Sequence, residues 1–232
     1  MDRSLKPLDV VYGSSARVDT QRVLRNTYAL LALSMVPTVL GAWLGVAMGF
    51  SFFAGSPMIG FLLFMGIAFG FFFAIEKFKN SGLGVLLLLG FTFFMGLMLS
   101  RLIGQALGLS NGARLISLAF GGTGLVFVGM AALASSTKRD LSGMGKWLFM
   151  GMIVILVAGI ANIWLQLPAL HLAIATMAVA VFSAFIAYDL KRVIDGGETN
   201  YVTATLAIYL DVYNVFTSLL QLLMALGGAG DD

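Results

Sequence analysis

Two acidic residues stand in stretches that are otherwise apolar, and together they could support proton chemistry. Asp211 lies near the middle of LAIYLDVYNVFTSLL, and Asp189 lies near the end of the preceding apolar stretch, in AFIAYDLKRV. An Asp at the centre of a membrane helix costs roughly 2.5–3.5 kcal/mol, so such a residue faces the protein interior and has a partner or a water path. Two carboxyl groups held close together cannot both ionise cheaply, and the pair can then share one proton.

A second interpretation is that each aspartate bonds separately to a nearby amide, hydroxyl or backbone group and only fixes helix packing. Asn214 follows Asp211 by three residues on the same helical face, so it is a candidate to support the acid by a hydrogen bond. With the turn at Gly196–Gly197, Asp189 lies seven residues before it and Asp211 fourteen after it. Straight antiparallel helices would then hold the two acids about 10 Å out of register. Contact between them requires an asymmetric hairpin or a break in a helix.

The composition of the chain is that of a membrane protein with several spans. Of its 232 residues, 59% are hydrophobic and only 11% are charged, whereas soluble domains carry roughly a quarter charged residues. The 28 glycines fit this class, because small residues let membrane helices approach closely. The absence of cysteine excludes disulfides, thiolate nucleophiles and thiolate metal sites.

Seven apolar segments are long enough to cross roughly 30 Å of hydrocarbon at 1.5 Å per residue. They cover about residues 27–49, 57–75, 82–104, 113–135, 147–166, 168–190 and 202–226. The sequence therefore predicts an all-α integral membrane protein, with Pro168 in the first turn of the sixth helix. Its parts are a polar tail over 1–26, a membrane domain over 27–226 and a short tail over 227–232.

The lysines and arginines predict the orientation. Twelve of the 14 lie in the N-terminal tail and in alternate loops, and only Arg101 and Arg114 lie on the other side. Basic residues concentrate on the cytoplasmic side of membrane proteins. We therefore expect a cytoplasmic N-terminus and an external C-terminus. The pI near 9.3 reflects this topology and does not require a nucleic-acid partner.

Several motifs carry a family resemblance. In chain order they are FGGTGLVF, ANIWLQLPALHLA, IAYDLKRV, GGETNYV and IYLDVYNVF. Together they resemble the transmembrane Bax inhibitor motif family, in its bacterial, YccA-like branch, whose type member modulates the membrane protease FtsH. The resemblance implies a bacterial inner-membrane protein of seven helices, with the last helix central and FtsH as a partner. In the channel-like members, two aspartates form a pH-sensitive dyad that controls a calcium leak. That role, with calcium as the ion bound, maps onto Asp189 and Asp211.

The channel-like members also have an Arg at the cytoplasmic end of the second helix, which pairs with the dyad in the closed state. The corresponding region here reads FFFAIEKFKN and offers Lys77 and Lys79 instead. A lysine cannot make the planar two-point contact that an arginine makes with a carboxylate. The resemblance therefore leaves Lys77 and Lys79 as candidates for a weaker latch.

Three functions compete at this point. The first is a regulator of FtsH, with the polar tail as the segment that the protease grips and with a pH-sensitive cation leak as a possible second activity. The second is a pH-gated calcium leak channel with no protease role, since calcium prefers oxygen ligands. The third, an intramembrane aspartyl protease, fits less well, because the second Asp follows IYL instead of G-x-G and the PAL at 168–170 precedes both acids. We expect a protein that is not an enzyme and has no bound cofactor. The sequence does not indicate its oligomeric state.

Overall fold

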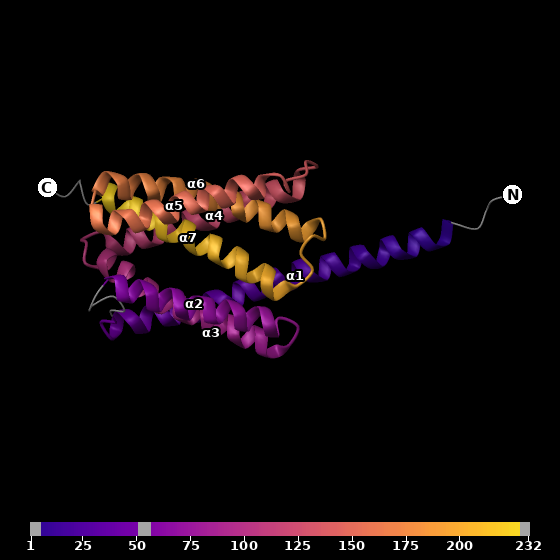
Figure 1. Ribbon diagram of the computed structural model, residues 1–232, viewed down its shortest axis with the longest axis horizontal. Helices are drawn as coiled ribbons and strands as arrows, with labels where there is room; N and C mark the ends of the chain where they lie inside the picture. Colours follow the sequence, from indigo (N-terminus) through magenta and orange to yellow (C-terminus); the bar gives the residue numbers. More distant parts are fainter. Residues whose placement is uncertain (1–5, 51–56, 228–232) are drawn as a thin grey trace.

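The computed structural model describes residues 6–50 and 57–227, which form seven α-helices and no strand (Figure 1). The helices are α1 (Lys6–Ala47), α2 (Pro57–Phe78), α3 (Gly82–Leu107), α4 (Gly112–Ser136), α5 (Met144–Leu165), α6 (Pro168–Ile194) and α7 (Tyr201–Gly227). Each contains a segment long and apolar enough to cross a membrane. The predicted all-α membrane fold with seven spans is confirmed. Residues 1–5 of the predicted N-terminal tail and 228–232 of the C-terminal tail lie outside the described residues.

Local sequence explains where α6 and α7 begin. Pro168 occupies the first turn of α6 as predicted, where its missing N–H leaves no helical hydrogen bond unmade. The preceding turn passes through Gln166, which adopts the left-handed conformation at φ 49°. At the start of α7, the Asn200 side-chain oxygen accepts hydrogen bonds from the backbone N–H of Val202 at 2.9 Å and of Thr203 at 3.3 Å. Asn200 thereby caps the helix.

The first helix is longer than the sequence interpretation suggested. Its apolar span covers Thr20–Ala47, but the helix itself begins at Lys6. Most of the polar tail is therefore helical and continuous with the span. Pro7 lies in the first turn, where proline is tolerated, and adding residues to an existing helix is far easier than starting one. The N-terminal part of α1 projects beyond the other helices (Figure 1).

The last helix joins the two sides of the bundle. On one side α1 and α2 pack against α3, and on the other α4 and α5 pack against α6. Helix α7 packs against α1, α2, α3, α4 and α6. It runs at an incline, with its first turns near α1 and α3 and its last turns near α4 and α6 (Figure 1). A central position for α7, enclosed by all six other helices, stays a prediction.

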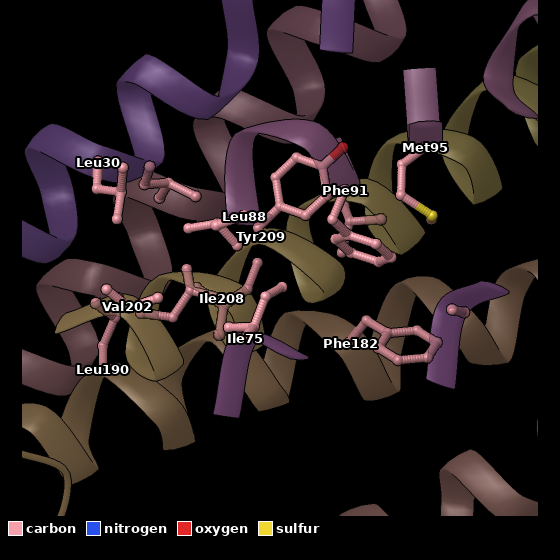
Figure 2. Packing of buried hydrophobic residues seen from close by; sticks show 14 of the residues in the cluster. Leu30, Ile75, Leu88, Phe91, Met95, Phe182, Leu190, Val202, Ile208 and Tyr209 are labelled. Atoms are coloured by element: carbon pink, nitrogen blue, oxygen red, sulfur yellow. The ribbon is translucent and has the colours of Figure 1, made fainter. Parts of the chain in front are cut away.

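Tyr209 is the largest fully buried side chain and links α7 to two other helices. Its ring lies edge-on to Phe91 of α3, with the ring centroids 6.4 Å apart (Figure 2). Its hydroxyl lies 2.8 Å from the Thr38 hydroxyl of α1 and donates to the Thr92 carbonyl of α3 at 3.4 Å. The phenol therefore fills the core and satisfies its polar tip at the same time.

Glycines allow α1 and α3 to approach closely. A Cβ atom added at Gly96 of α3 would meet the backbone carbonyl of Thr38, and one added at Gly41 of α1 would meet that of Phe93. Close approach through small residues is a common way for membrane helices to associate. This contact fixes one wall of the bundle against which α7 packs.

Candidate functional site

Asp189 of α6 and Asp211 of α7 meet inside the bundle. Both are buried, with 9% and 6% of their surfaces exposed, and they are the only buried acidic residues in the described part of the chain. Their carboxyl groups are close enough to interact electrostatically. A hydrogen bond between two carboxyl groups requires a proton on one of them. We call Asp189 and Asp211 the acid pair.

The incline of α7 brings the two acids together without a break in either helix. Asp189 lies five residues before the end of α6, and Asp211 lies ten residues after the start of α7. Because α7 begins away from α6 and then crosses toward it (Figure 1), its rise of about 1.5 Å per residue is not wholly directed along α6. Of the two geometries that the sequence allowed, the structure adopts the asymmetric hairpin.

The two carboxylates have different surroundings. The Asp189 Oδ1 atom lies 3.5 Å from Nη1 of Arg192, which follows it by three residues on α6. The Asp211 Oδ2 atom is buried and has no hydrogen-bond partner among the described residues. Buried polar atoms are rarely left without a partner, and those that are invite an explanation in terms of a ligand, ion, water or proton. Asp211 is thus the acid with the greater need for a proton or a cation.

Arg192 also connects the acid pair to the loops at one end of the bundle. Its Nη2 atom lies 3.8 Å from Oε2 of Glu198, whose Oε1 accepts the backbone N–H of Asn200 at 2.9 Å. The Asn200 amide in turn donates to Oδ1 of Asn80 at 2.8 Å and to the Lys79 carbonyl at 3.3 Å. This loop network, made of Arg192, Glu198, Asn200 and Asn80, runs from Asp189 to the α2–α3 loop.

The two lysines proposed as a latch have other contacts. Lys79 forms an ion pair with Glu76 one turn earlier in the chain. The Lys77 amine lies over the Phe78 ring, 5.6 Å from its centroid. Neither lysine is paired with the acid pair among the described residues, so a latch formed by them stays a prediction for another state of the protein. The sequence interpretation did not select Arg192, although its spacing of three residues from Asp189 is a signal for a side-chain contact on a helix.

Asn214 does not bond to Asp211 in the described part of the chain. Its amide donates instead to the Leu210 carbonyl of the same helix at 2.7 Å. A polar side chain that bonds within its own helix can lie at an apolar interface at little cost. Support of the acid pair by Asn214 stays a prediction.

The acid pair alone would hold a cation loosely. Calcium takes roughly six to eight oxygen ligands, and the described residues contain no cluster of three or more His, Cys, Asp or Glu side chains. The Arg192 guanidinium beside Asp189 competes with any cation for that carboxylate.

Fold and site define the class of this molecule: a seven-helix membrane protein with two interacting carboxyl groups buried between its last two helices. The sequence model described as "inhibitor of apoptosis-promoting Bax1" matches residues 20–228. The chain belongs to this Bax inhibitor family.

Named relatives extend the similarity over most of the chain. An uncharacterized protein of Neisseria meningitidis is 38% identical over 222 residues, covering 95% of this chain and 98% of the relative. The protein of Escherichia coli K12 named modulator of FtsH protease YccA is 36% identical over 212 residues, covering 91% and 94%. An uncharacterized membrane protein of Vibrio cholerae is 36% identical over 206 residues, covering 89% and 90%.

Proposed function

We propose that this chain is an inner-membrane modulator of the FtsH protease. The observation that carries the proposal is its similarity to the Escherichia coli protein of that name, which extends over 91% of this chain at 36% identity. A similarity of this extent covers most of the seven-helix membrane domain. The proposal includes a cytoplasmic N-terminus and an external C-terminus, supported by the distribution of lysine and arginine.

The projecting part of α1 is the element that we assign to contact with the protease. It begins at Lys6, whereas the apolar span begins at Thr20. At about 1.5 Å per residue, this part extends roughly 20 Å beyond the span. It lies at the end of the bundle that carries the α2–α3, α4–α5 and α6–α7 loops (Figure 1), which is the end with most of the basic residues.

The test uses purified FtsH and this chain in the same proteoliposomes. Degradation of a second membrane protein by FtsH should slow when the full chain is present, and an inactive FtsH should retain the chain during purification. A chain that lacks residues 2–18 is the matched control, because it keeps all seven spans. If the full chain neither binds FtsH nor changes the degradation rate, the protein has another function.

The acid pair favours a second activity, a pH-sensitive path for cations such as calcium. With one shared proton the pair carries a single negative charge and can bond across α6 and α7, which holds the path closed. At higher pH the second proton leaves, the like charges repel, and the site can open or accept a cation. The supporting observation is the buried Asp211 carboxylate, whose Oδ2 atom has no hydrogen-bond partner among the described residues.

Calcium entry into proteoliposomes that contain this chain alone tests the cation path. Flux measured between about pH 5 and pH 8 should rise with pH, because the acid pair loses its shared proton and titrates as a unit. Because FtsH is absent, the result is independent of the first proposal. If calcium flux is no greater than in protein-free vesicles, the acid pair has only a structural role.

A further inference from the structure

A cavity of about 260 Å³ lies between α2, α3 and α7. Ala68, Phe69 and Phe72 of α2 line one wall, and Met95 of α3 and Asn214 of α7 line the others. An apolar cavity of roughly 150 Å³ is large enough to bind benzene. This cavity therefore has room for several methylene groups.

The cavity lies at the depth of the hydrocarbon core. Its lining residues fall within 64–72 of α2, at 91 and 95 of α3 and within 210–214 of α7, and each set is near the middle of its span. The surroundings at that depth are lipid chains, because the hydrocarbon core is roughly 30 Å thick. The part of a molecule that enters the cavity from the membrane at this depth must therefore be apolar.

The lining of the cavity is mostly apolar. Two lining residues carry polar groups, and each uses part of its hydrogen-bonding capacity within the protein: the Asn214 amide donates to the Leu210 carbonyl at 2.7 Å and the Tyr213 hydroxyl donates to the Met95 carbonyl at 3.2 Å. Polar contacts for a water are therefore confined to one side of the cavity. A buried water typically needs two to four polar partners. The remaining wall is formed by aromatic and aliphatic side chains, which offer none.

The cavity opens toward the membrane beside α2. Phe69 on its rim is 50% exposed, whereas Ala68 at its base is 6% exposed. Helix α2 packs chiefly against α3 and makes few contacts with α7, and side chains of both α2 and α7 line the cavity between them.

We infer that this cavity binds part of an acyl chain of a bilayer phospholipid, whose headgroup remains at the membrane surface. The cavity is too small for a whole lipid, and the rest of the chain lies among its neighbours in the bilayer. The position of the cavity in the hydrocarbon core favours this occupant, because phospholipid chains are the abundant apolar groups at the middle of the membrane. The inference is independent of the proposed function.

Fluorescence quenching by brominated phospholipids tests this inference. The native Trp43, Trp147 and Trp164 are replaced by Phe, and a single tryptophan is introduced by Phe72→Trp on the cavity wall or by Phe73→Trp. Phe73 is 77% exposed and reports ordinary lipid contact at the same depth. Vesicles contain phosphatidylcholine brominated near the middle of its acyl chains. Both tryptophans should be quenched.

The deciding variant fills the cavity. Adding Ala68→Leu should reduce quenching of the tryptophan in Phe72→Trp several-fold and leave that in Phe73→Trp unchanged. Gly70→Leu adds one carbon more than Ala68→Leu, at a position where no atom lies within 4 Å of the new Cβ, and it should change neither signal. Ala68→Met, with a more flexible side chain, should repeat the effect of Ala68→Leu without displacing α2.

Two results would overturn the inference. Absent quenching at Phe72→Trp, with normal quenching at Phe73→Trp, would mean that no acyl chain enters the cavity. Quenching at Phe72→Trp that is unaffected by both Ala68 substitutions would mean that the surrounding lipid reaches this position without using the cavity.

Discussion

The guanidinium of Arg192 lies 3.5 Å from the carboxylate of Asp189, one turn earlier in α6. The side chain of Asp189 is 11% exposed and that of Arg192 is 43% exposed, so this contact joins the buried site to the surface. Solvent screens the exposed partner, which limits what the pair contributes to stability. Its larger effect is to place a positive charge next to one member of the acid pair.

Replacing Arg192 should alter the pH response of the proposed cation path. In Arg192→Gln, the loss of a positive charge beside Asp189 disfavours the doubly ionised pair, so half-maximal flux should require a higher pH. Lys191→Gln is the control, because the Lys191 amine bonds to the Thr137 carbonyl at 3.1 Å and to Asp195 at 2.9 Å. Flux measured across pH in proteoliposomes distinguishes the two. If flux depends on pH in the same way in Arg192→Gln and Lys191→Gln, Arg192 does not control the response. A shift of the half-maximal pH in Lys77→Ala or Lys79→Ala would instead support a latch formed by a lysine.

Removing either carboxyl group should abolish the pH dependence of flux. In Asp211→Asn and Asp189→Asn the side chain keeps its shape and can still hydrogen-bond, but the pair can no longer exchange a proton as a unit. The matched control is Asp195→Asn, on the exposed α6–α7 loop. The measurement is calcium flux across pH, with gel filtration to check folding. Single variants that titrate like the parent would show that the acid pair is not the pH sensor.

The predicted orientation can be tested with fusions. A reporter that is active only outside the cytoplasm should be active when fused after Asp232 and silent when fused after Lys138, because basic residues stay on the cytoplasmic side. Enzyme activity in intact cells is the measurement. Activity at Lys138 and silence at Asp232 would reverse the topology.

Deletion of residues 2–18 should lengthen the lifetime of the chain in cells that contain FtsH. The deletion removes the projecting part of α1 and leaves its apolar span, which begins at Thr20, so the bundle should still fold. Pulse–chase decay in cells with and without FtsH provides the comparison. An unchanged lifetime in FtsH-containing cells would mean that the protease does not grip this segment.

The close contact between α1 and α3 should be sensitive to a single methyl group. Gly96→Ala places a Cβ atom against the backbone carbonyl of Thr38, and overpacking of this kind typically costs about 1–3 kcal/mol. Gly66→Ala is the control, since its Cβ would meet no atom within 4 Å. The free energy of unfolding in mixed micelles is the measurement. A Gly96→Ala protein as stable as Gly66→Ala would show that α1 and α3 can separate freely.

The sequence predicted the spans well because apolar runs and their polar breaks are local signals. The span predicted at 82–104 corresponds to helix α3 (Gly82–Leu107), and the span predicted at 202–226 corresponds to helix α7 (Tyr201–Gly227). The helical extension of α1 was missed because polar composition says little about whether a helix continues. The family resemblance points to the end of α2 for the basic group beside the acids and hence to the lysines there. The three-residue spacing between Asp189 and Arg192 on α6 is the signal that identifies Arg192 instead. The cavity was unpredictable, since it depends on how α7 inclines against α2 and α3.

The contacts of α7 have a consequence for biosynthesis. Tyr209 and the rest of its buried residues complete a core that α1, α3, α4 and α6 share, yet α7 is the last of the seven helices to leave the ribosome. Chains are made from the N-terminus, and early segments wait for later ones. The faces that α7 covers must therefore remain in the membrane without their partner until translation is nearly finished, while α1 and α2 can already pack against α3, and α4 and α5 against α6. A chain that stops before Tyr201 would expose those faces permanently and should be recognised as defective, whichever of its first six helices had inserted correctly.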